Sequence, residues 1–461
     1  MYNGYVTRVK NIRPAENADR LNLCEAFGNT VVVDKNINET DLYVYFPCDG
    51  QLSLGFCLNN NLLRKLPDGT PGTGYMDPDK RNVVAIKLRG NKSDGLILPL
   101  SCLNYCFDNG AAANLKLGDT ISVVNGHEIC CKYIPRQQHR RGGYSEGNKT
   151  RKKKVDVAPL FMEHVDTEQL AYNLNAFKSG DEIEITLKMH GTSQRTAYLP
   201  VLKGYKRTLM DKLFRREGTP IYEYNLVTGT RRTVIEDTEG GYYGSNEFRM
   251  PHAEQFRGKL WKGEEIFYEV VAYTSDGTPI MASGKVPKEY QNQYGETMEF
   301  SYGCSPDGKT TLYGRDDEGG FSLETEVPQS DIYVYRMTMT NEDGNVVEYT
   351  PDFMRYRCEQ MGIKCVPVLW KGTIPENPAS ADDPTITAGE WIKNVAERFY
   401  DGPDPIGKTH IREGVVVRIV NKPKFCAYKH KNWLFKYISG IITESVADGN
   451  VNVDEEILSE L

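Results

Sequence analysis

The sequence lacks the long apolar runs and the short cysteine pairs that mark membrane proteins and zinc-binding proteins. None of the apolar runs in its 461 residues approaches the roughly 18 residues that a membrane span needs. The first residues contain no apolar core of a signal peptide. The 11 cysteines are scattered without a Cys-x-x-Cys pair, which favours reduced thiols. We therefore expect a cytoplasmic protein (in the host cytoplasm if the source is a virus) with no membrane partner and no structural metal.

Basic charge is scarce in the chain as a whole. The 56 Lys and Arg residues face 63 Asp and Glu residues, a net charge of −7 that excludes a uniformly basic nucleic-acid coat protein. The exception is the polar segment 136–154, whose basic residues could meet a phosphate backbone. A solvated linker explains this segment equally well. The candidate nucleic-acid contacts are Arg136, Arg140, Arg141, Arg151, Lys152, Lys153 and Lys154.

The first part of the chain has the pattern of a small β module. Short apolar runs alternate with turn signals such as Asp49-Gly50 and Asp94-Gly95, which predicts about five strands. An OB-like barrel over residues 1–135 is our first choice, although other small β modules fit the same pattern. The expected strands are Thr30–Val33, Leu42–Phe46, Val83–Leu88, Leu96–Leu98 and Ile121–Val124.

The remainder predicts an α+β protein in which a second, larger domain follows the barrel. We expect a basic linker over 136–155, a domain of antiparallel sheets with flanking helices over 156–445, and an acidic tail over 446–461. Polar, glycine-rich stretches at about 203–260 and 276–328 indicate insertions or surface loops. One helix should begin at Thr350-Pro351 and end at Gly362, and another should cover Trp391 to Tyr400. Strands are expected at 181–187, 266–273, 332–337 and 414–420.

The stretch Lys188-Met189-His190-Gly191 follows an alternating strand pattern, Asp181–Leu187. A lysine at a strand end with a glycine three residues later predicts a tight turn, where the backbone can approach a ligand closely. We take Lys188 as a candidate nucleophile. A surface lysine in a turn explains these residues as well, so the rest of the chain must decide.

Further charged residues stand at expected strands. Glu269 lies among large apolar residues, where an unpaired carboxylate is costly, and Glu413 opens an apolar β-branched run. Lys429 and Lys431 are two residues apart, so on a strand their ammonium groups face the same side and require an anion or open water. Each element alone also fits an ordinary ion pair or a solvated face.

The order of these elements resembles the covalent nucleotidyltransferase superfamily of DNA ligases, RNA ligases and mRNA capping enzymes. Lys188-Met189-His190-Gly191 resembles the nucleophile motif, and Tyr268-Glu269-Val270-Val271 resembles the third motif. Tyr335 lies in a stretch like the aromatic motif that follows it. The fourth and fifth motifs are matched by Glu413-Gly414-Val415-Val416-Val417 and by Lys429-His430-Lys431-Asn432.

Finer features resemble ATP-dependent RNA ligases with an N-terminal OB module. His190 stands where DNA ligases usually carry Asp, and the stretch from Lys188 to Arg195 reads Lys-x-His-Gly-Thr-Ser-x-Arg. Lys87-Leu88-Arg89-Gly90 in the first module is also similar to these ligases. DNA ligases and capping enzymes place their barrel after the fifth motif, but too few residues follow Lys431 here.

The resemblance implies a three-step reaction and a role for each matched residue. Lys188 would attack ATP to form a lysyl-adenylate, the adenylyl group would pass to a 5′-phosphate end of RNA, and a 3′-hydroxyl would displace AMP. Lysine is almost wholly protonated at its unperturbed pKa of about 10.4, so the like charges of Lys429 and Lys431 should lower the pKa of Lys188. They should also neutralise phosphate charge.

The resemblance assigns the remaining residues to the cofactors. Glu413 would hold Mg²⁺ or Mn²⁺, and Glu269 would bind ribose or metal. Tyr335 would stack on adenine, and Arg195 would contact ribose or phosphate. His190 and Gly191 would shape the turn at the nucleotide.

Three classes of function therefore stay open. The first is a monomeric RNA ligase acting on nicks or other RNA ends with 5′-phosphate and 3′-hydroxyl groups. The second is an ATP-dependent DNA ligase or a capping-type nucleotidyltransferase. The third is a non-catalytic nucleic-acid-binding protein with a relict ligase core, against which the intact Lys188, Glu269, Glu413, Lys429 and Lys431 argue.

Overall fold

The computed structural model describes residues 2–108, 112–133, 157–214, 218–236, 238–239, 243–316, 319–379 and 385–447. The expected basic linker with its candidate nucleic-acid contacts lies outside these residues, as does nearly all of the expected acidic tail. None of the helices in the described ranges combines the length and the apolar character that crossing a bilayer requires. The chain divides into two compact units, the first formed by Met1–Gln137 with Trp433–Asn450 and the second by Gln138–Asn432.

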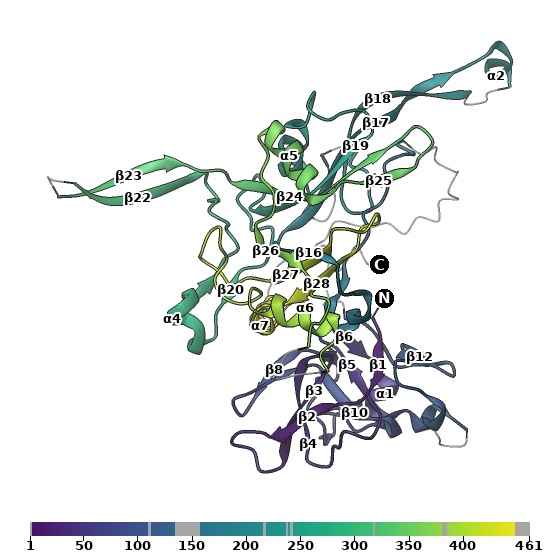
Figure 1. Cartoon of the computed structure of the whole chain (residues 1–461), viewed down its shortest axis with the longest axis vertical. Coiled ribbons are helices and arrows are strands. Elements are labelled where there is room, and N and C mark those ends of the chain that lie inside the picture. The colour runs from purple at the N-terminus through teal and green to yellow at the C-terminus, as the bar shows by residue number, and fades with distance from the viewer. Residues whose placement is uncertain are drawn as a thin grey trace. The chain divides into compact units, whose positions relative to one another are not determined.

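The first unit is built from short antiparallel strands around an apolar core (Figure 1). Its sheets have the strand orders β10-β5-β1-β11, β14-β6-β7 and β2-β3-β4, with two further hairpins, β8-β9 and β12-β13. The core gathers Val44, Phe46, Leu52, Phe56 and Leu103, all fully buried. The elements are β1 (Gly4–Thr7), β2 (Lys10–Pro14), β3 (Leu21–Ala26), β4 (Asn29–Asp34), β5 (Tyr43–Phe46), β6 (Gly50–Leu52), α1 (Leu54–Asn59), β7 (Asn82–Val83), β8 (Ala85–Leu88), β9 (Asn91–Asp94), β10 (Leu96–Pro99), β11 (Thr120–Ile121), β12 (Val123–Val124), β13 (His127–Glu128), β14 (Cys130–Lys132) and α7 (Trp433–Ala447).

The strands expected in this unit are present, but two are divided. The run 83–88 forms β7 and β8, and the run 121–124 forms β11 and β12. The described strands form separate sheets and show no closed barrel. The OB-like barrel therefore stays a prediction, while the mainly antiparallel α+β architecture is confirmed.

Helix α7 belongs to the first unit, although it follows the last strand of the second. Trp433 Nε1 donates a hydrogen bond to the Ser93 carbonyl oxygen (3.3 Å), and Lys436 pairs with Asp94. Lys92 Nζ lies 5.0 Å from the centre of the Trp433 ring. The expected larger domain extended to residue 445, whereas these contacts place the chain from Trp433 with the N-terminal strands.

The second unit contains two five-stranded sheets. The first has the order β15-β28-β27-β16-β26 and the second the order β18-β17-β19-β24-β25. Except for the parallel pair β15 and β28, neighbouring strands are antiparallel. Their elements are β15 (Glu168–Gln169), β16 (Glu182–Leu187), β17 (Thr192–Lys206), β18 (Thr219–Gly229), β19 (Glu264–Ala272), β24 (Ser330–Thr340), β25 (Val346–Glu348), β26 (Val368–Thr373), β27 (Gly414–Ile419) and β28 (Ala427–Lys431).

The chain crosses from the first sheet to the second through one turn. Strand β16 ends at Leu187 and β17 begins at Thr192, so the turn is residues 188–191. In β16 the side chains of Ile183, Ile185 and Leu187 are buried, as the period-two pattern predicts. Lys188 therefore lies where the two sheets are joined.

The helices of the second unit begin and end at recognisable capping residues. The hydroxyl of Thr350 accepts from Phe353 N at the start of α5 (Pro351–Met361), and Gly362 ends it with a φ of 71°. Helix α6 (Ala388–Glu397) begins before the expected Trp391, because Thr387 and Glu390 form a capping box. The short helices are α2 (Leu209–Leu213), α3 (Met250–Glu254) and α4 (Gln291–Tyr294).

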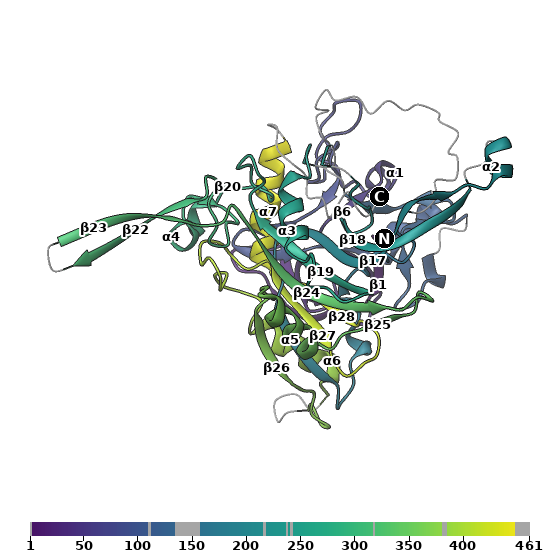
Figure 2. The ribbon, with the colours of Figure 1, turned by 90° about the horizontal axis from the view of Figure 1, so that it is seen from above.

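The two expected insertions have different structures. Residues 203–260 include β18, which pairs with β17 along its whole length and forms an edge of the second sheet. Its many exposed side chains explain why the sequence looked like a loop. Residues 276–328 contain β20 (Gly284–Lys285), β21 (Thr297–Met298) and the ribbon of β22 (Lys309–Asp316) and β23 (Gly319–Glu326), which projects from its unit (Figures 1 and 2).

Candidate active site

Lys188 and Glu413 form an ion pair at the turn between the sheets of the second unit. Lys188 N donates to the Gly414 carbonyl oxygen (3.0 Å), which fixes the turn against the start of β27. The Lys188 ammonium lies 2.9 Å from Glu413 Oε1. Glu413 is 2% exposed, and Asn432 N donates to its carbonyl oxygen (2.8 Å). Residues 225 positions apart in the chain are thus held together by the β16–β27 pairing.

Glu413 lies among three side chains that can carry positive charge. Lys431 Nζ is 3.0 Å from Oε1, and His190 Nδ1 is 3.4 Å from Oε2. Burial opposes ionisation of Glu413, but Lys188, Lys431 and His190 outweigh it and hold its pKa well below the ordinary value. The carboxylate is therefore charged at neutral pH, and it holds two lysines beside each other.

Two glycines are required by space at this site. A Cβ on Gly191 would lie 2.4 Å from the Val270 carbonyl oxygen and 2.9 Å from Glu269 Cγ. Gly414 has a φ of 149°, and a Cβ there would lie 2.1 Å from the His430 carbonyl oxygen. The glycine at position 191 was expected to let the backbone approach a ligand. In the structure the backbone does make a close approach at Gly191, but to strand β19.

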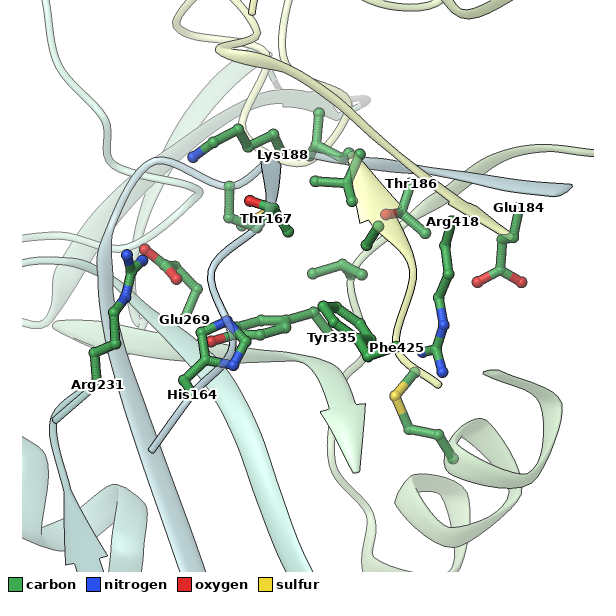
Figure 3. Close-up of a pocket in the computed structure, with 16 residues that line it drawn as sticks. His164, Thr167, Glu184, Thr186, Lys188, Arg231, Glu269, Tyr335, Arg418 and Phe425 are labelled. Atoms are coloured by element: carbon green, nitrogen blue, oxygen red, sulfur yellow. The ribbon is translucent and has the colours of Figure 1, made fainter. Parts of the chain in front are cut away.

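A pocket opens beside Lys188 and is lined by both sheets (Figure 3). Lys188, Glu269 and Arg231 lie on one side, and Glu184 and Arg418 lie on the opposite side. The lining also includes Thr167 and Thr186, and the apolar Leu187, Met189, Met354, Val366, Val416 and Ala427.

The pocket has an aromatic surface formed by Tyr335, His164 and Phe425 (Figure 3). The His164 ring centre lies 5.4 Å from that of Tyr335 and 6.2 Å from that of Phe425. The hydroxyls of Tyr335 and Ser193 are hydrogen-bonded at 2.9 Å, which fixes the tyrosine ring. Burial, and next the charge of Glu269, raise the pKa of Tyr335, so its phenol stays protonated. A flat heteroaromatic ring could pack against this surface.

The charged groups at the far side of the pocket are already paired within the protein. Glu184 accepts two hydrogen bonds from Arg355 (2.9 and 2.7 Å), and Lys371 approaches it at 3.3 Å. Arg418 donates to Glu348 (3.2 Å) and to the Tyr349 carbonyl oxygen (2.9 Å). The charges of this side are therefore largely compensated within the protein.

Arg195 lies in β17 of the second sheet, outside the pocket lining. It is 2% exposed, and its Nε donates to the Thr230 carbonyl oxygen (2.8 Å). Its guanidinium pairs with Glu265 at 3.2 Å and stacks 3.7 Å from the centre of the Phe161 ring. These contacts hold the Arg195 side chain within the protein, and its expected contact with the nucleotide stays a prediction.

Arg231 is the pocket arginine that sequence reasoning missed. Its Nη1 donates to Asp166 Oδ1 (2.7 Å), and its side chain is 13% exposed. It lies just after β18, within a stretch interpreted as an insertion. The pair Arg231-Arg232 after the Leu226–Thr228 run was the available signal, but only the β17–β18 pairing brings Arg231 to the side of the pocket where Lys188 lies.

The two motif lysines differ in position. Lys431 reaches Glu413, as described, whereas Lys429 lies two residues earlier on the same face of β28, paired with Val416 and Gln169. Neither is part of the pocket lining. His430, the residue between the two lysines, anchors strand β28. Its Nε2 lies 3.3 Å from Glu397, and its ring stacks on Tyr400.

The chain was compared with known proteins. No protein-family model matches it, and no curated protein matches it either. Among solved structures, a mutant Naegleria gruberi RNA ligase with AMP and Mn is similar at 15% identity, covering 96% of this chain and 98% of that chain with a TM-score of 0.51. This chain shares the fold of that RNA ligase.

Two further structures of the Naegleria gruberi enzyme agree. The form with PPi shows 16% identity, covers 96% of this chain and 98% of that chain, and has a TM-score of 0.51. A mutant with ATP and Mn shows 16% identity, covers 94% and 98%, and has a TM-score of 0.52. The RNA ligase fold therefore extends over both units, and the chemistry must be argued from the site.

Proposed function

We propose that this protein is an ATP-dependent RNA ligase that joins 5′-phosphate and 3′-hydroxyl ends through a lysyl-adenylate on Lys188. The observation that carries the proposal is the position of Lys188. Its ammonium is held by buried Glu413 and lines a pocket that combines an aromatic surface with the basic side chains of Lys188 and Arg231. A nucleotide has the matching halves, a flat base and an anionic phosphate chain.

The first step would be nucleophilic displacement at the α-phosphorus of ATP. The Lys188 nitrogen, once deprotonated, forms a P–N bond while the bond to the β-phosphate oxygen breaks and pyrophosphate leaves. Arg231 and Lys431 would offset the charge that develops on the phosphates. The ring of Tyr335, with His164 and Phe425, would hold adenine by packing.

A divalent cation fits the residues at the phosphate side. The described residues contain no group of three His, Cys, Asp or Glu side chains that could form an all-protein cage. Mg²⁺ is commonly held by one or two carboxylates together with substrate phosphates, and Glu269 and Glu413 are the carboxylates that would hold it here. The cation would neutralise phosphate charge. The Naegleria gruberi structures with ATP and Mn, AMP and Mn, and PPi support this choice of ligands.

RNA recognition is assigned to the first unit and to the basic segment 136–154. An OB-like module and clustered Lys and Arg would grip phosphates with little sequence preference. The adenylyl group would then pass to the 5′-phosphate, and a 3′-hydroxyl would attack it and release AMP. The proposal includes sealing of nicks and action as a cytoplasmic monomer.

The test is covalent labelling with α-labelled ATP. We expect label on the wild-type protein that survives denaturation, none on Lys188→Ala, and normal labelling of the control Lys285→Ala, an exposed lysine of β20. Labelling by GTP instead would indicate a capping-type enzyme. Label that persists in Lys188→Ala would reject the proposal.

Substrate choice needs a second assay. Nicked duplexes that differ only in ribose or deoxyribose at the 3′-hydroxyl end should be sealed unequally, with ribose preferred. Equal sealing of both would favour a DNA ligase. If the protein is labelled by ATP but seals neither duplex, it forms the lysyl-adenylate without joining RNA ends, and the proposed ligase activity is rejected.

A further inference from the structure

The segment 276–328 reaches the turn that carries the candidate nucleophile. Tyr302 lies in this segment, and its hydroxyl oxygen accepts a hydrogen bond from His190 N at 2.8 Å. The Tyr302 side chain is buried, at 4% exposure. Burial, and next the charge of Asp404, raise the pKa of its phenol, so the group stays neutral. A side chain 112 positions away thus satisfies a backbone donor two residues after Lys188.

The backbone of Tyr302 is held in a conformation that a bulky residue rarely adopts. Its φ is 47°, in the left-handed region, and Gly303 follows with a φ of 82°. Gly407 packs against this bend so closely that a Cβ there would lie 3.2 Å from Tyr302 Cα and from Gly303 N. Such strain persists where the surrounding structure enforces it, often at functional sites. The tyrosine is therefore presented to the turn by two packed loops.

The same segment also fixes the imidazole of His190. The Phe300 ring meets the His190 ring edge-on, with centres 4.5 Å apart and planes at 76°. His410 packs on both aromatics, 4.9 Å from Phe300 and 4.5 Å from Tyr302. His190 is thus held through its backbone and its ring, and its Nδ1 remains 3.4 Å from Glu413 Oε2.

We propose that Tyr302 is a positioning residue that fixes the turn 188–191 and orients the Lys188–Glu413 pair for attack. This inference rests on the proposed lysyl-adenylate function. Tyr302 does not line the pocket, so it acts through His190 and without touching the nucleotide. The segment that looks like an insertion in the sequence would then be part of the catalytic apparatus.

The test compares Tyr302→Phe with Tyr294→Phe in single-turnover labelling by ATP. Tyr302→Phe removes the hydroxyl and keeps the ring that packs on His410. Tyr294 is a buried tyrosine of α4 in the same segment and is the matched control. We expect the maximal rate of labelling to fall about tenfold or more in Tyr302→Phe, because the His190 N–H loses its acceptor and the turn loses a fixed contact. ATP affinity should change by less than about threefold, since the pocket lining is intact.

Thermal denaturation of each variant separates positioning from folding. The inference holds if Tyr302→Phe loses labelling rate, keeps ATP affinity and melts within a few degrees of Tyr294→Phe. An unchanged rate in Tyr302→Phe, with an active wild type, would overturn the inference and leave the proposed function in place. Equal rate losses in both variants, or a loss that appears only as weaker ATP binding, would also overturn it. A wild type that forms no adenylate would reject both proposals.

Discussion

Glu413 shows how a single buried carboxylate can organise an active site. Its side chain is 1% exposed, and ammonium groups lie at 2.9 and 3.0 Å from the same oxygen. Burial of one charge without partners is costly, so the two lysines and Glu413 stabilise one another. The arrangement keeps Lys188 beside the pocket. When a nucleotide binds, its phosphates would replace Glu413 as the partner of Lys431.

The two arginines near the site should respond differently to substitution. Arg195→Lys should lower the free energy of unfolding by about 2–4 kcal/mol, because one ammonium cannot replace the buried contacts to Thr230, Glu265 and Phe161. Arg231→Lys should change stability by less than about 1 kcal/mol, because Arg231 is partly exposed, and should slow labelling by ATP.

Chemical denaturation and single-turnover labelling of both variants check this contrast. Weak ATP binding by a fully stable Arg195→Lys protein would show instead that Arg195 contacts the nucleotide, as the resemblance implied.

At the scale of elements, a half-buried histidine links helix α3 to the second sheet. His252 in α3 is hydrogen-bonded through Nε2 to the Ser330 hydroxyl at the start of β24 (2.8 Å). Burial lowers the pKa of His252 to about 4; Asp331 opposes this shift and Arg249 adds to it. Protonation in the folded state is therefore harder than in the unfolded chain, where the pKa is about 6.5.

This shift predicts acid sensitivity with a defined direction. The stability from neutral His252 is fully present above pH 6.5 and is lost as the pH falls toward 4, because the unfolded chain then binds the proton more readily. We expect the free energy of unfolding to fall by roughly 1–3 kcal/mol over this range through His252. His252→Gln should remove that part of the pH dependence, and His127→Gln, at an exposed histidine, should not. Identical pH profiles for wild type and His252→Gln would contradict the assignment.

The turn between the sheets explains why the short motif at residues 188–191 holds Lys188 in a defined position. Residues 188–191 join β16 to β17, so any shift of the turn moves the ends of both sheets. Gly191 packs on β19 and His190 on Tyr302, and these contacts leave the turn little freedom. The nucleophile therefore sits on rigid elements, as precise group transfer requires.

At the scale of the whole molecule, the chain returns to its first unit after completing the second. Lys431 ends β28, and Trp433 begins the helix that packs on the N-terminal strands. The first unit is thus formed by residues that precede the second unit and by the helix that follows it. A fragment that ends before Trp433 would lack α7 and expose the surface that it covers.

This arrangement predicts that Trp433→Ala destabilises the N-terminal unit. The indole is 9% exposed and stacks on Tyr437 with ring centres 5.0 Å apart, so truncation should cost about 3–5 kcal/mol. Limited proteolysis with mass spectrometry should then show faster cleavage within residues 2–133. The half-buried Trp391 of α6 is the matched control, and Trp391→Ala should affect the second unit. Faster cleavage of the second unit in Trp433→Ala would contradict this.

The sequence by itself determined the strand pattern and the order of the chemical groups. Period-two alternation located β16 and an apolar β-branched run located β27, whereas Lys188, Glu269, Glu413 and Lys431 were identified because the order of their motifs resembles that of the nucleotidyltransferases. Capping residues likewise located α5. Strand periodicity and helix capping are local features, because neighbouring residues in the sequence determine them.

Only the tertiary structure decided which distant residues meet. It placed Arg231 in the pocket lining and Arg195 outside it, brought Tyr302 to His190, and assigned α7 to the first unit. Each of these contacts depends on strand register and loop packing between residues far apart in the chain. Spacing along one strand shows which side a side chain faces, but not which distant segment lies opposite it.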